Sequence, residues 1–328
     1  MPEAEQLKLK FIDLFSGIGG FRIAGQRCNL ECVFSSEIDK SASQTYFENF
    51  GSMPSGDITE IHSKDIPDHD ILTAGFPCQA FSIAGKKEGF KDTRGTLFFD
   101  IARILKEKKP KAFLLENVKG LLSNNKGKTI QRIYQVLSEI GYYTLDPIVL
   151  NSTYFGVPQN RERVYLVGFI DESVRKKFKM PINHLRTNKS IKDILENDPV
   201  SNKFYLSENY LQTLISHKDR HSRKGNGFGF EIKSVNDYAA TLVIGGMGLE
   251  RNLIIDNKIT DYTPVTNIKS PISKKNIRRL TPRECARLQG FPDDYKFPVS
   301  DSVAYKLIAN SVTINVVEEL LKRIISVI

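Results

Sequence analysis

The chain has 328 residues, 40% of them hydrophobic, which is enough for one large domain or for a large and a small one. Its 47 lysines and arginines outnumber its 38 aspartates and glutamates, and the net charge of +9 favours an acidic partner such as nucleic acid. No apolar run reaches the roughly 18 to 20 residues of a membrane span and no export signal is evident, so we expect a cytoplasmic protein without membrane contact. Four cysteines and five scattered histidines argue against a disulfide scaffold and predict reduced thiols and no metal site.

The first half of the chain alternates between short apolar runs and helical patterns. Strands are predicted at residues 9–14, 32–35, 70–74, 112–115, 147–150 and 164–169. Helical spacing is clear in Leu97, Phe98, Ile101, Ile104 and Leu105. This alternation predicts an α/β fold with a doubly wound, mostly parallel sheet that is covered by helices on both faces.

The character of the chain changes after these elements. Residues 186–275 are rich in Asn, Ser, Gly and Lys and show no long helical period, which predicts a smaller, irregular, β-containing domain. Helical signals then return, and an apolar stripe predicts a last helix that packs on the first domain; it consists of Val312, Val316, Val317, Leu320, Leu321 and Ile324. We therefore expect a large domain of residues 1–185 and 276–328, and a small one of residues 186–275.

A glycine-rich turn, Ser16-Gly17-Ile18-Gly19-Gly20, follows the first predicted strand. Arg22 stands where the third glycine of the dinucleotide fingerprint would be, which disfavours a pyrophosphate site. Glu37 follows about 20 residues after the turn, at the end of the second strand, where a carboxylate accepts hydrogen bonds from ribose hydroxyls. Asp57 is in place to accept from an adenine amino group. The combination points to an adenosine cofactor without a diphosphate, namely S-adenosylmethionine.

A cysteine on a stiff turn follows the predicted strand 70–74. Pro77 fixes its own φ and restricts Phe76, so the turn holds the Cys78 thiol in one direction. A lone cysteine is more often a small buried hydrophobic residue than a nucleophile. The motifs elsewhere in the chain reverse that balance and favour a nucleophile at the end of a buried strand.

Five segments, in this order, make the chain resemble the DNA cytosine-5 methyltransferase family, of the short bacterial restriction-modification type. They are Asp13–Gly20, Gly75–Gln79, Glu116–Val118, Gln159–Arg163 and Arg278–Arg287. The resemblance covers nearly the whole chain except the small domain, and it implies the Rossmann-like fold of S-adenosylmethionine-dependent methyltransferases with a target-recognition domain. One departure is Ala309, because the family usually has glycine before the asparagine of this segment; its methyl group bears on cofactor affinity.

The resemblance implies a catalytic set of Cys78, Glu116, Arg163 and Arg161. Carbon 5 of cytosine is a poor nucleophile, so an enzyme must first add a group to carbon 6, and the Cys78 thiolate is the candidate. Glu116 is expected to bind ring nitrogen 3 and the exocyclic amino group. Arg163 is expected to contact the ring oxygen and to orient Glu116, with Arg161 close by.

The same resemblance implies where the ligands bind. The S-adenosylmethionine site, without metal, is expected at Phe15, Gly17, Ile18, Gly20, Glu37, Ile38, Asp57, Ile58, Gly75, Leu97, Asn310 and Ser311. Double-stranded DNA is expected to contact a lid at residues 79–95 and the small domain, because the target cytosine must leave the base stack. The expected DNA-binding residues are Gln79, Ser82, Lys86, Lys87, Arg94, Arg220, Arg223, Lys224 and Gly246. We expect a monomer that protects DNA from a restriction endonuclease without binding that endonuclease.

Three other functions stay open at this point. A tRNA cytosine-5 methyltransferase shares part of the fold, but the sizeable small domain favours duplex DNA. A nicotinamide oxidoreductase shares the sheet, but Arg22 and the Pro77-Cys78 turn argue against it. A DNA-binding module without catalytic activity is disfavoured by the presence of Cys78, Glu116 and Arg163 together.

Overall fold

The computed structural model describes residues 8–76, 97–181, 185–223, 225, 229–243, 248–264 and 270–328. The chain forms two compact units. Unit 1 consists of Met1–Asn151, Glu162–His184 and Ser311–Ile328, and unit 2 consists of Ser152–Arg161 and Leu185–Asn310. Within the described ranges, no helix is long and apolar enough to cross a membrane.

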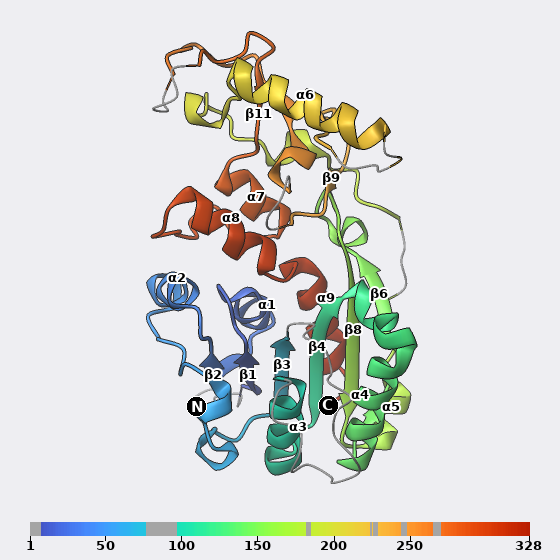
Figure 1. Cartoon of the computed structure of the whole chain (residues 1–328). Helices are drawn as coiled ribbons and strands as arrows, with labels where there is room; N and C mark the ends of the chain where they lie inside the picture. The colour runs from blue at the N-terminus through green and yellow to red at the C-terminus, as the bar shows by residue number, and fades with distance from the viewer. Residues whose placement is uncertain are drawn as a thin grey trace. The chain divides into compact units, whose positions relative to one another are not determined.

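Unit 1 is built on one large sheet (Figure 1). Its strands in the described part of the chain are β1 (Lys10–Leu14), β2 (Glu31–Ser36), β3 (Ile71–Gly75), β4 (Ala112–Val118), β5 (Tyr143–Thr144), β6 (Ile148–Asn151) and β8 (Glu162–Phe169). They lie in the order β2-β1-β3-β4-β8-β5, and β6 also pairs with β8. The six strands predicted from the sequence are confirmed.

The sheet is mixed and not wholly parallel. The pairs among β1 to β4 are parallel, whereas β8 is antiparallel to β4, β5 and β6. Thus β8 is reversed against the other strands. An antiparallel neighbour needs no crossover helix, and β6 and β8 are separated only by the short segment Ser152–Arg161, which belongs to unit 2.

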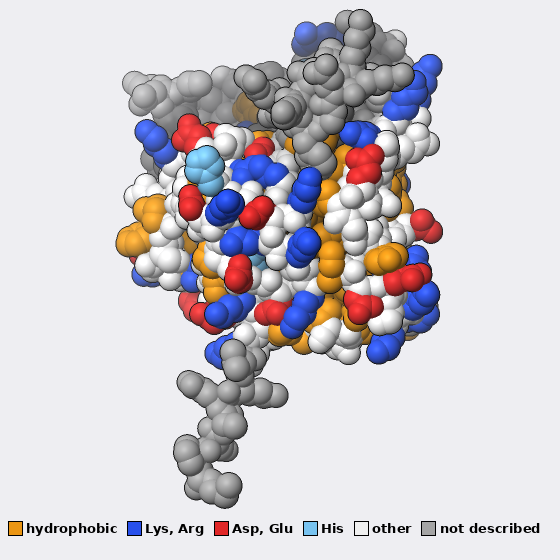
Figure 2. All heavy atoms as spheres, turned by 90° about the horizontal axis from the view of Figure 1, so that it is seen from below, with side chains coloured by type: hydrophobic (Ala, Val, Ile, Leu, Met, Phe, Trp, Pro, Cys, Tyr) orange, Lys and Arg blue, Asp and Glu red, His pale blue; other side chains and the backbone are white. Residues whose placement is uncertain are grey.

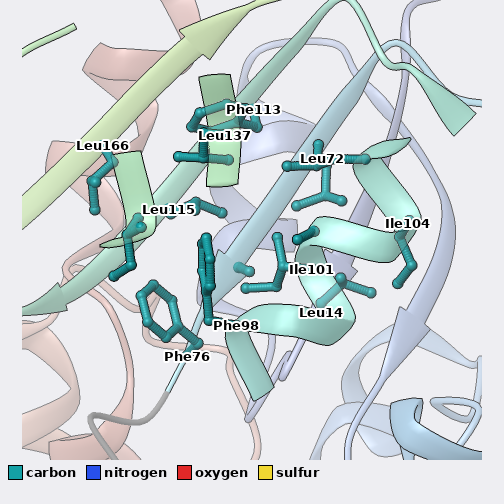
Figure 3. Packing of buried hydrophobic residues seen from close by; sticks show 14 of the residues in the cluster. Leu14, Leu72, Phe76, Phe98, Ile101, Ile104, Phe113, Leu115, Leu137 and Leu166 are labelled. Carbon is teal, nitrogen blue, oxygen red and sulfur yellow. The ribbon is translucent and has the colours of Figure 1, made fainter. Parts of the chain in front are cut away.

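Helices cover both faces of this sheet, as predicted. The α-helices of unit 1 among the described residues are α1 (Gly20–Arg27), α2 (Lys40–Phe50), α3 (Leu97–Lys108), α4 (Lys128–Glu139), α5 (Glu172–Lys177) and α9 (Ile314–Ile325). Side chains of α3 and α4 form one buried cluster with Leu14, Leu72 and Leu115 of the sheet (Figure 3). On the other face α1 and α9 pack together, and a Cβ built on Gly25 would lie 2.6 Å from the Phe11 ring. The predicted packing of the last helix on the first domain is therefore confirmed.

Unit 2 contains less regular structure, in keeping with the irregular composition of its sequence. Its helices within the described residues are α6 (Glu208–Arg223), α7 (Pro282–Leu288) and α8 (Asp301–Asn310). Its short strands form two pairs: β7 (Gln159–Asn160) with β9 (Ala239–Ala240), and β10 (Ile254–Ile255) with β11 (Ile277–Arg278). A small core gathers Leu206, Leu211, Leu214, Leu253 and Ile277.

Helix α6 corrects one sequence interpretation, because residues 186–275 do contain a long helix of 16 residues. The buried residues of this helix are Leu211 and Leu214. A helix with so narrow an apolar face leaves little 3.6-residue periodicity in the sequence. The remaining positions are largely polar, and they resemble the loop composition that surrounds them.

The two units also differ from the expected domain boundaries, since residues 276–310 group with unit 2. The buried Arg278 side chain explains the grouping. Its Nε donates to Asp256 Oδ2 at 2.7 Å, and its Nη1 and Nη2 donate to the Glu284 carboxylate at 2.7 and 2.8 Å. Through these bonds β11 and α7 share charged partners with the segment that follows β10.

The surface at the amino ends of the unit 1 strands carries both signs of charge. Figure 2 shows basic and acidic side chains interspersed on this face. Lys111 pairs there with Asp70 at 2.9 Å, and Lys108 pairs with Asp68 at 3.2 Å. Mixed charges of this kind are typical of a solvated surface.

Candidate active site

The candidate site of unit 1 lies at the carboxyl ends of β1 to β4. In an open sheet, ligands bind outside the carboxyl ends of parallel strands. The register pairs Leu14 with Ser36 and with Ala74, and it pairs Gly75 with Glu116. This register brings four predicted segments to one edge of the sheet: Phe15–Gly20, Glu37–Ile38, Gly75–Phe76 and Glu116–Val118.

The glycine-rich turn is held in shape by Glu37. Gly17 has a φ of 53° and Phe15 a φ of 55°, a left-handed conformation that is uncommon for a phenylalanine. Glu37 Oε2 accepts from the Gly17 N–H at 2.8 Å, and Glu37 Oε1 accepts from the Asp39 N–H at 2.7 Å. A carboxylate has about four lone-pair sites, so this fixed group keeps acceptor capacity for further donors.

The other predicted cofactor residues of this edge differ in what they present. Ile38 is 71% exposed, so its side chain is available to an apolar ring. Asp57 Oδ1 accepts from the Thr59 N–H at 2.9 Å and caps the short helix η1 (Ile58–Glu60). Ile58 itself is 2% exposed and packs in the core, which leaves its backbone as the part that can face a ligand. Leu97 begins α3 and is half-buried.

Gly20 is packed against the segment that precedes α9. A Cβ built on Gly20 would lie 2.7 Å from Val312 Cγ2 and 2.8 Å from Ser311 Oγ. The close approach of α1 to this segment therefore requires glycine at position 20. Asn310, the neighbouring predicted residue, belongs to unit 2 and is exposed.

We expect Gly20→Ala to lower the free energy of unfolding by about 1–3 kcal/mol, the usual cost of overpacking. The added methyl group meets Val312 and Ser311, and the first turn of α1 would have to move. Gly120→Ala is the matched control, because a Cβ there has nothing within 4 Å. Urea denaturation followed by circular dichroism measures both variants. Equal midpoints for the two would contradict the packing argument.

A buried carboxyl group lies behind the glycine-rich turn. Asp13 is fully buried in β1, and burial holds its pKa well above the ordinary value, although Arg22 opposes the shift. Arg22 instead donates to Tyr46 Oη at 3.0 Å and stacks over the Phe50 ring at 4.6 Å. From the sequence, Arg22 only argued against a pyrophosphate site. In the structure, its contacts join α1 to α2.

Glu116 and Arg163, predicted from separate segments, form an ion pair. Arg163 Nε lies 3.1 Å from Glu116 Oε1, and the Glu116 residue is 8% exposed. The antiparallel register of β4 and β8 produces this contact, because it pairs Val118 with Arg163. Gly75 lies beside the same carboxyl group. A Cβ built on Gly75 would lie 3.8 Å from Glu116 Oε2. Arg163 therefore orients the Glu116 carboxyl group beside Gly75, the last residue of β3.

The sequence interpretation missed the role of Asn117. This residue is 2% exposed, and its Nδ2 donates to the Phe76 carbonyl oxygen at 2.8 Å. Its Oδ1 accepts from the Val118 N–H at 2.8 Å. The amide thus fixes the chain directly before Pro77. The available signal was a polar residue at the end of an apolar run, but its partner lies 41 positions away in the sequence.

Other predicted residues belong to unit 2 or lie outside the described ranges. Arg161 is 3% exposed in unit 2, where its Nη1 donates to the Leu242 carbonyl oxygen at 3.5 Å. Arg220 and Arg223 are exposed on the last turn of α6. The predicted residues outside the described ranges are Cys78, Gln79, Ser82, Lys86, Lys87, Arg94, Lys224 and Gly246.

Comparison with known proteins agrees with this geometry. Residues 9–326 match the profile of the C-5 cytosine-specific DNA methylase family. The chain is 54% identical over 321 residues to the Type II methyltransferase M.HpaII of Haemophilus parainfluenzae, covering 97% of this chain and 89% of that protein. It is 43% identical over 318 residues to the Type II methyltransferase M.HhaI of Haemophilus parahaemolyticus, covering 94% and 92%. The structure of the S. pombe Dnmt2 methyltransferase has a similar fold, with a TM-score of 0.74 at 22% identity, covering 97% of this chain and 99% of that one.

Proposed function

Because the chain belongs to the family of C-5 cytosine-specific DNA methylases, we propose that it methylates carbon 5 of a cytosine flipped out of a short specific sequence in duplex DNA. The observation that carries the proposal is the Glu116–Arg163 ion pair at the carboxyl edge of the sheet. It places an oriented carboxyl group next to Gly75, from which the chain continues to the predicted nucleophile. The Type II relatives favour DNA over tRNA as the substrate.

The residues of this edge divide the reaction between them. The Cys78 thiolate adds to carbon 6 of cytosine, and the electron pair of the carbon 5–carbon 6 double bond moves toward the ring nitrogen 3. Glu116 supplies a proton or hydrogen bond at nitrogen 3 and accepts one from the exocyclic amino group that distinguishes cytosine. Arg163 holds Glu116 in that orientation and contacts the ring oxygen. When bound, S-adenosylmethionine would supply the methyl group for carbon 5 from its sulfonium sulfur and would leave as S-adenosylhomocysteine. A base then removes the carbon 5 proton, and the Cys78 sulfur leaves as the double bond re-forms.

The residues of unit 1 fit S-adenosylmethionine, which this family uses. The Glu37 carboxylate is fixed by two backbone N–H groups and still has lone pairs for ribose hydroxyls. Ile38 offers an exposed apolar side chain beside it. The predicted residues that remain as candidates for this site are Phe15, Gly17, Ile18, Gly20, Asp57, Ile58, Gly75, Leu97, Asn310 and Ser311.

Glu37→Ala is expected to weaken S-adenosylmethionine binding by about 1.5–3 kcal/mol, the scale for losing hydrogen bonds to a charged group. Glu37→Gln should fall between this variant and the wild type, because it keeps an acceptor oxygen and loses the charge. Isothermal titration calorimetry measures the affinities. Glu31→Ala is the control, because Glu31 is exposed at the start of β2, the strand that ends just before Glu37. Unchanged affinity in Glu37→Ala would remove this residue from the site.

Unit 2 is proposed to read the DNA sequence. Its residues 186–275 hold the exposed Arg220 and Arg223, and also two glycine-rich stretches that could enter a groove with little steric bulk. Lys224 and Gly246 belong to these stretches by sequence. Phosphate contacts by the α6 cations would position the DNA, whereas base contacts would select the site. We propose a monomeric, metal-independent enzyme that protects DNA from a restriction endonuclease.

The test of the proposed function combines two measurements. Purified protein should transfer the labelled methyl group of S-adenosylmethionine to duplex DNA, in the presence of a metal chelator, and not to tRNA. Bisulfite sequencing of DNA from cells that express the protein should then show protected cytosines in one short sequence. Labelling of tRNA with unmodified DNA would favour the RNA alternative, and a strict need for metal would contradict the metal-independent mechanism.

A further inference from the structure

One arginine of α3 binds two short helices in the segment between α2 and β3. Arg103 Nη2 donates to the Ile58 carbonyl oxygen in η1. Its Nη1 donates to Ser63 Oγ at 2.9 Å, in η2 (Ser63–Asp65). Its Nε donates to Asp100 Oδ1 at 2.8 Å, one turn earlier on α3. A guanidinium presents its N–H groups in a rigid fork, so Arg103 fixes all three partners at once.

Ile58 is held at its side chain and at its backbone. The side chain is 2% exposed and packs in the core of unit 1. The carbonyl oxygen accepts from the Ile61 N–H at 3.3 Å as well as from Arg103. The first of these bonds only closes the turn of η1, whereas the second reaches a residue 45 positions away. Arg103 is therefore the polar contact that sets the backbone of η1 against α3.

The residue before Ile58 is the candidate acceptor for the adenine amino group. Asp57 Oδ1 accepts from the Thr59 N–H at 2.9 Å and from Thr59 Oγ1 at 2.8 Å. Asp57 Oδ2 accepts no hydrogen bond from the described part of the chain, and the residue is half-buried. One oxygen thus holds the carboxylate in a fixed orientation, and the other is left for a donor on a ligand.

We propose that Arg103 is a positioning residue for adenine recognition in the cofactor site. It sets the Asp57–Ile58 backbone, and with it the place where Asp57 Oδ2 meets the base, and it has no part in bond formation. Leu97, another candidate cofactor residue, begins the same helix, so Arg103 also fixes Asp57 relative to Leu97. This inference rests on the proposed function, because it assigns a specificity role within the proposed S-adenosylmethionine site.

The test compares two ligands that differ only in the base. S-adenosylhomocysteine carries the adenine amino group, which is a donor. S-inosylhomocysteine carries a carbonyl oxygen at that position, and this oxygen faces the Asp57 carboxylate as a second acceptor. A site that hydrogen-bonds one group rejects an analogue that lacks it. Calorimetry on the wild type should therefore show at least about a hundredfold preference for S-adenosylhomocysteine.

Arg103→Met removes the three hydrogen bonds and keeps a long unbranched side chain. The Ile58 carbonyl group then loses its bond to α3, and Asp57 is no longer held against the base. We expect the ratio of the two dissociation constants to fall about tenfold, which is about 1.4 kcal/mol and near the lower end for a hydrogen bond to a charged group. Arg103→Lys keeps a charged donor and should restore part of the ratio. A merely structural role would weaken both ligands equally and leave the ratio unchanged.

Two further variants test whether Arg103 acts through Asp57. Asp57→Ala should remove the preference, and adding Arg103→Met to it should not change the ratio further. Asp100→Ala frees the guanidinium from its partner on α3 and should lower the ratio, even if Arg103→Met fails to fold. Arg132→Met is the control and should keep the ratio, because Arg132 lies on α4 with a 41% exposed side chain that pairs with Glu139 at 3.6 Å.

The outcomes separate this inference from the proposed function. A folded Arg103→Met or Asp100→Ala variant with the wild-type ratio would overturn the inference. A further fall in the double variant, or a wild type that binds both ligands equally, would do the same. A wild type that prefers S-adenosylhomocysteine but fails to methylate DNA would instead refute the proposed function and leave adenine recognition intact.

Discussion

Cys78→Ala is expected to lower methyl transfer by at least about a thousandfold while leaving cofactor and DNA binding nearly unchanged. The thiol acts by forming a bond to carbon 6, and loss of a nucleophile affects turnover far more than ground-state binding. Cys78 lies outside the described residues, and two described residues shortly before it are held by contacts at the end of β4. Asn117 fixes the Phe76 carbonyl group, and Gly75 borders the Glu116 carboxyl group. A methyl-transfer assay on a sequence identified by bisulfite sequencing measures the loss.

A second measurement on the wild type tests the covalent step directly. DNA that carries 5-fluorocytosine should form a stable adduct, because fluorine cannot leave carbon 5 as a proton does. The control variant is Cys32→Ala, which should keep both activity and adduct formation, since burial raises the pKa of Cys32 to about 11 and leaves it a thiol at neutral pH. Turnover in Cys78→Ala, or no adduct on a denaturing gel, would refute the nucleophile.

The sheet could be predicted from the sequence because its central strands β1, β3, β4 and β8 are apolar runs that are almost wholly buried. The run before Gly75 and the run before Glu116 both end in the residues that the chemistry needs, and strand ends of a parallel sheet meet at one edge. The direction of β8 could not be predicted, since an apolar run reads the same in a parallel or an antiparallel strand. Helix α6 escaped notice because its buried residues are Leu211 and Leu214, too few for a clear period.

Some residues of the candidate site could likewise be predicted from the sequence, and others could not. Glu37 was predicted from its position at a strand end, whereas Glu116 was predicted from the resemblance to the methyltransferase family. The roles of Asn117 and Gln159 could not be predicted, because each side chain bonds a backbone group 41 or more positions away in the sequence. No local sequence pattern indicates such a partner. Ile58 was expected at the cofactor, but an isoleucine after a loop aspartate serves equally as a core residue, and the structure uses its side chain in that way.

The buried charges around Arg278 lead to the second large expected effect. Arg278 is 1% exposed, and its guanidinium is shared between Asp256 and the fully buried Glu284. Glu284 also accepts from the Thr281 N–H at 2.8 Å, which closes the capping box of α7. Burial alone would raise the pKa of Asp256, yet the Lys258 N–H and the Arg278 guanidinium lower it. A carboxyl group with a lowered folded-state pKa adds stability at neutral pH, and this contribution is lost as the pH falls below about 4.

Glu284→Gln should lower the free energy of unfolding by about 3–5 kcal/mol, because it removes one of the two carboxylates that balance the buried Arg278 charge. Glu231→Gln is the matched control in the same unit. Its carboxylate pairs with Lys233 at 2.5 Å but its side chain is 51% exposed, so the expected loss is about 0–1 kcal/mol. Urea denaturation followed by circular dichroism measures both.

The sign of the coupling decides whether the charges or only the packing matter. Glu284→Gln is costly if it leaves the buried Arg278 guanidinium without a matching charge. In that case Arg278→Met combined with Glu284→Gln should destabilise the protein less than the sum of the two single variants, because the double variant no longer buries an unmatched guanidinium. Strict additivity would mean that the two side chains act only through packing. In that case the stabilising role of Glu284 would come from its capping bond to Thr281 within α7 and not from its pair with Arg278.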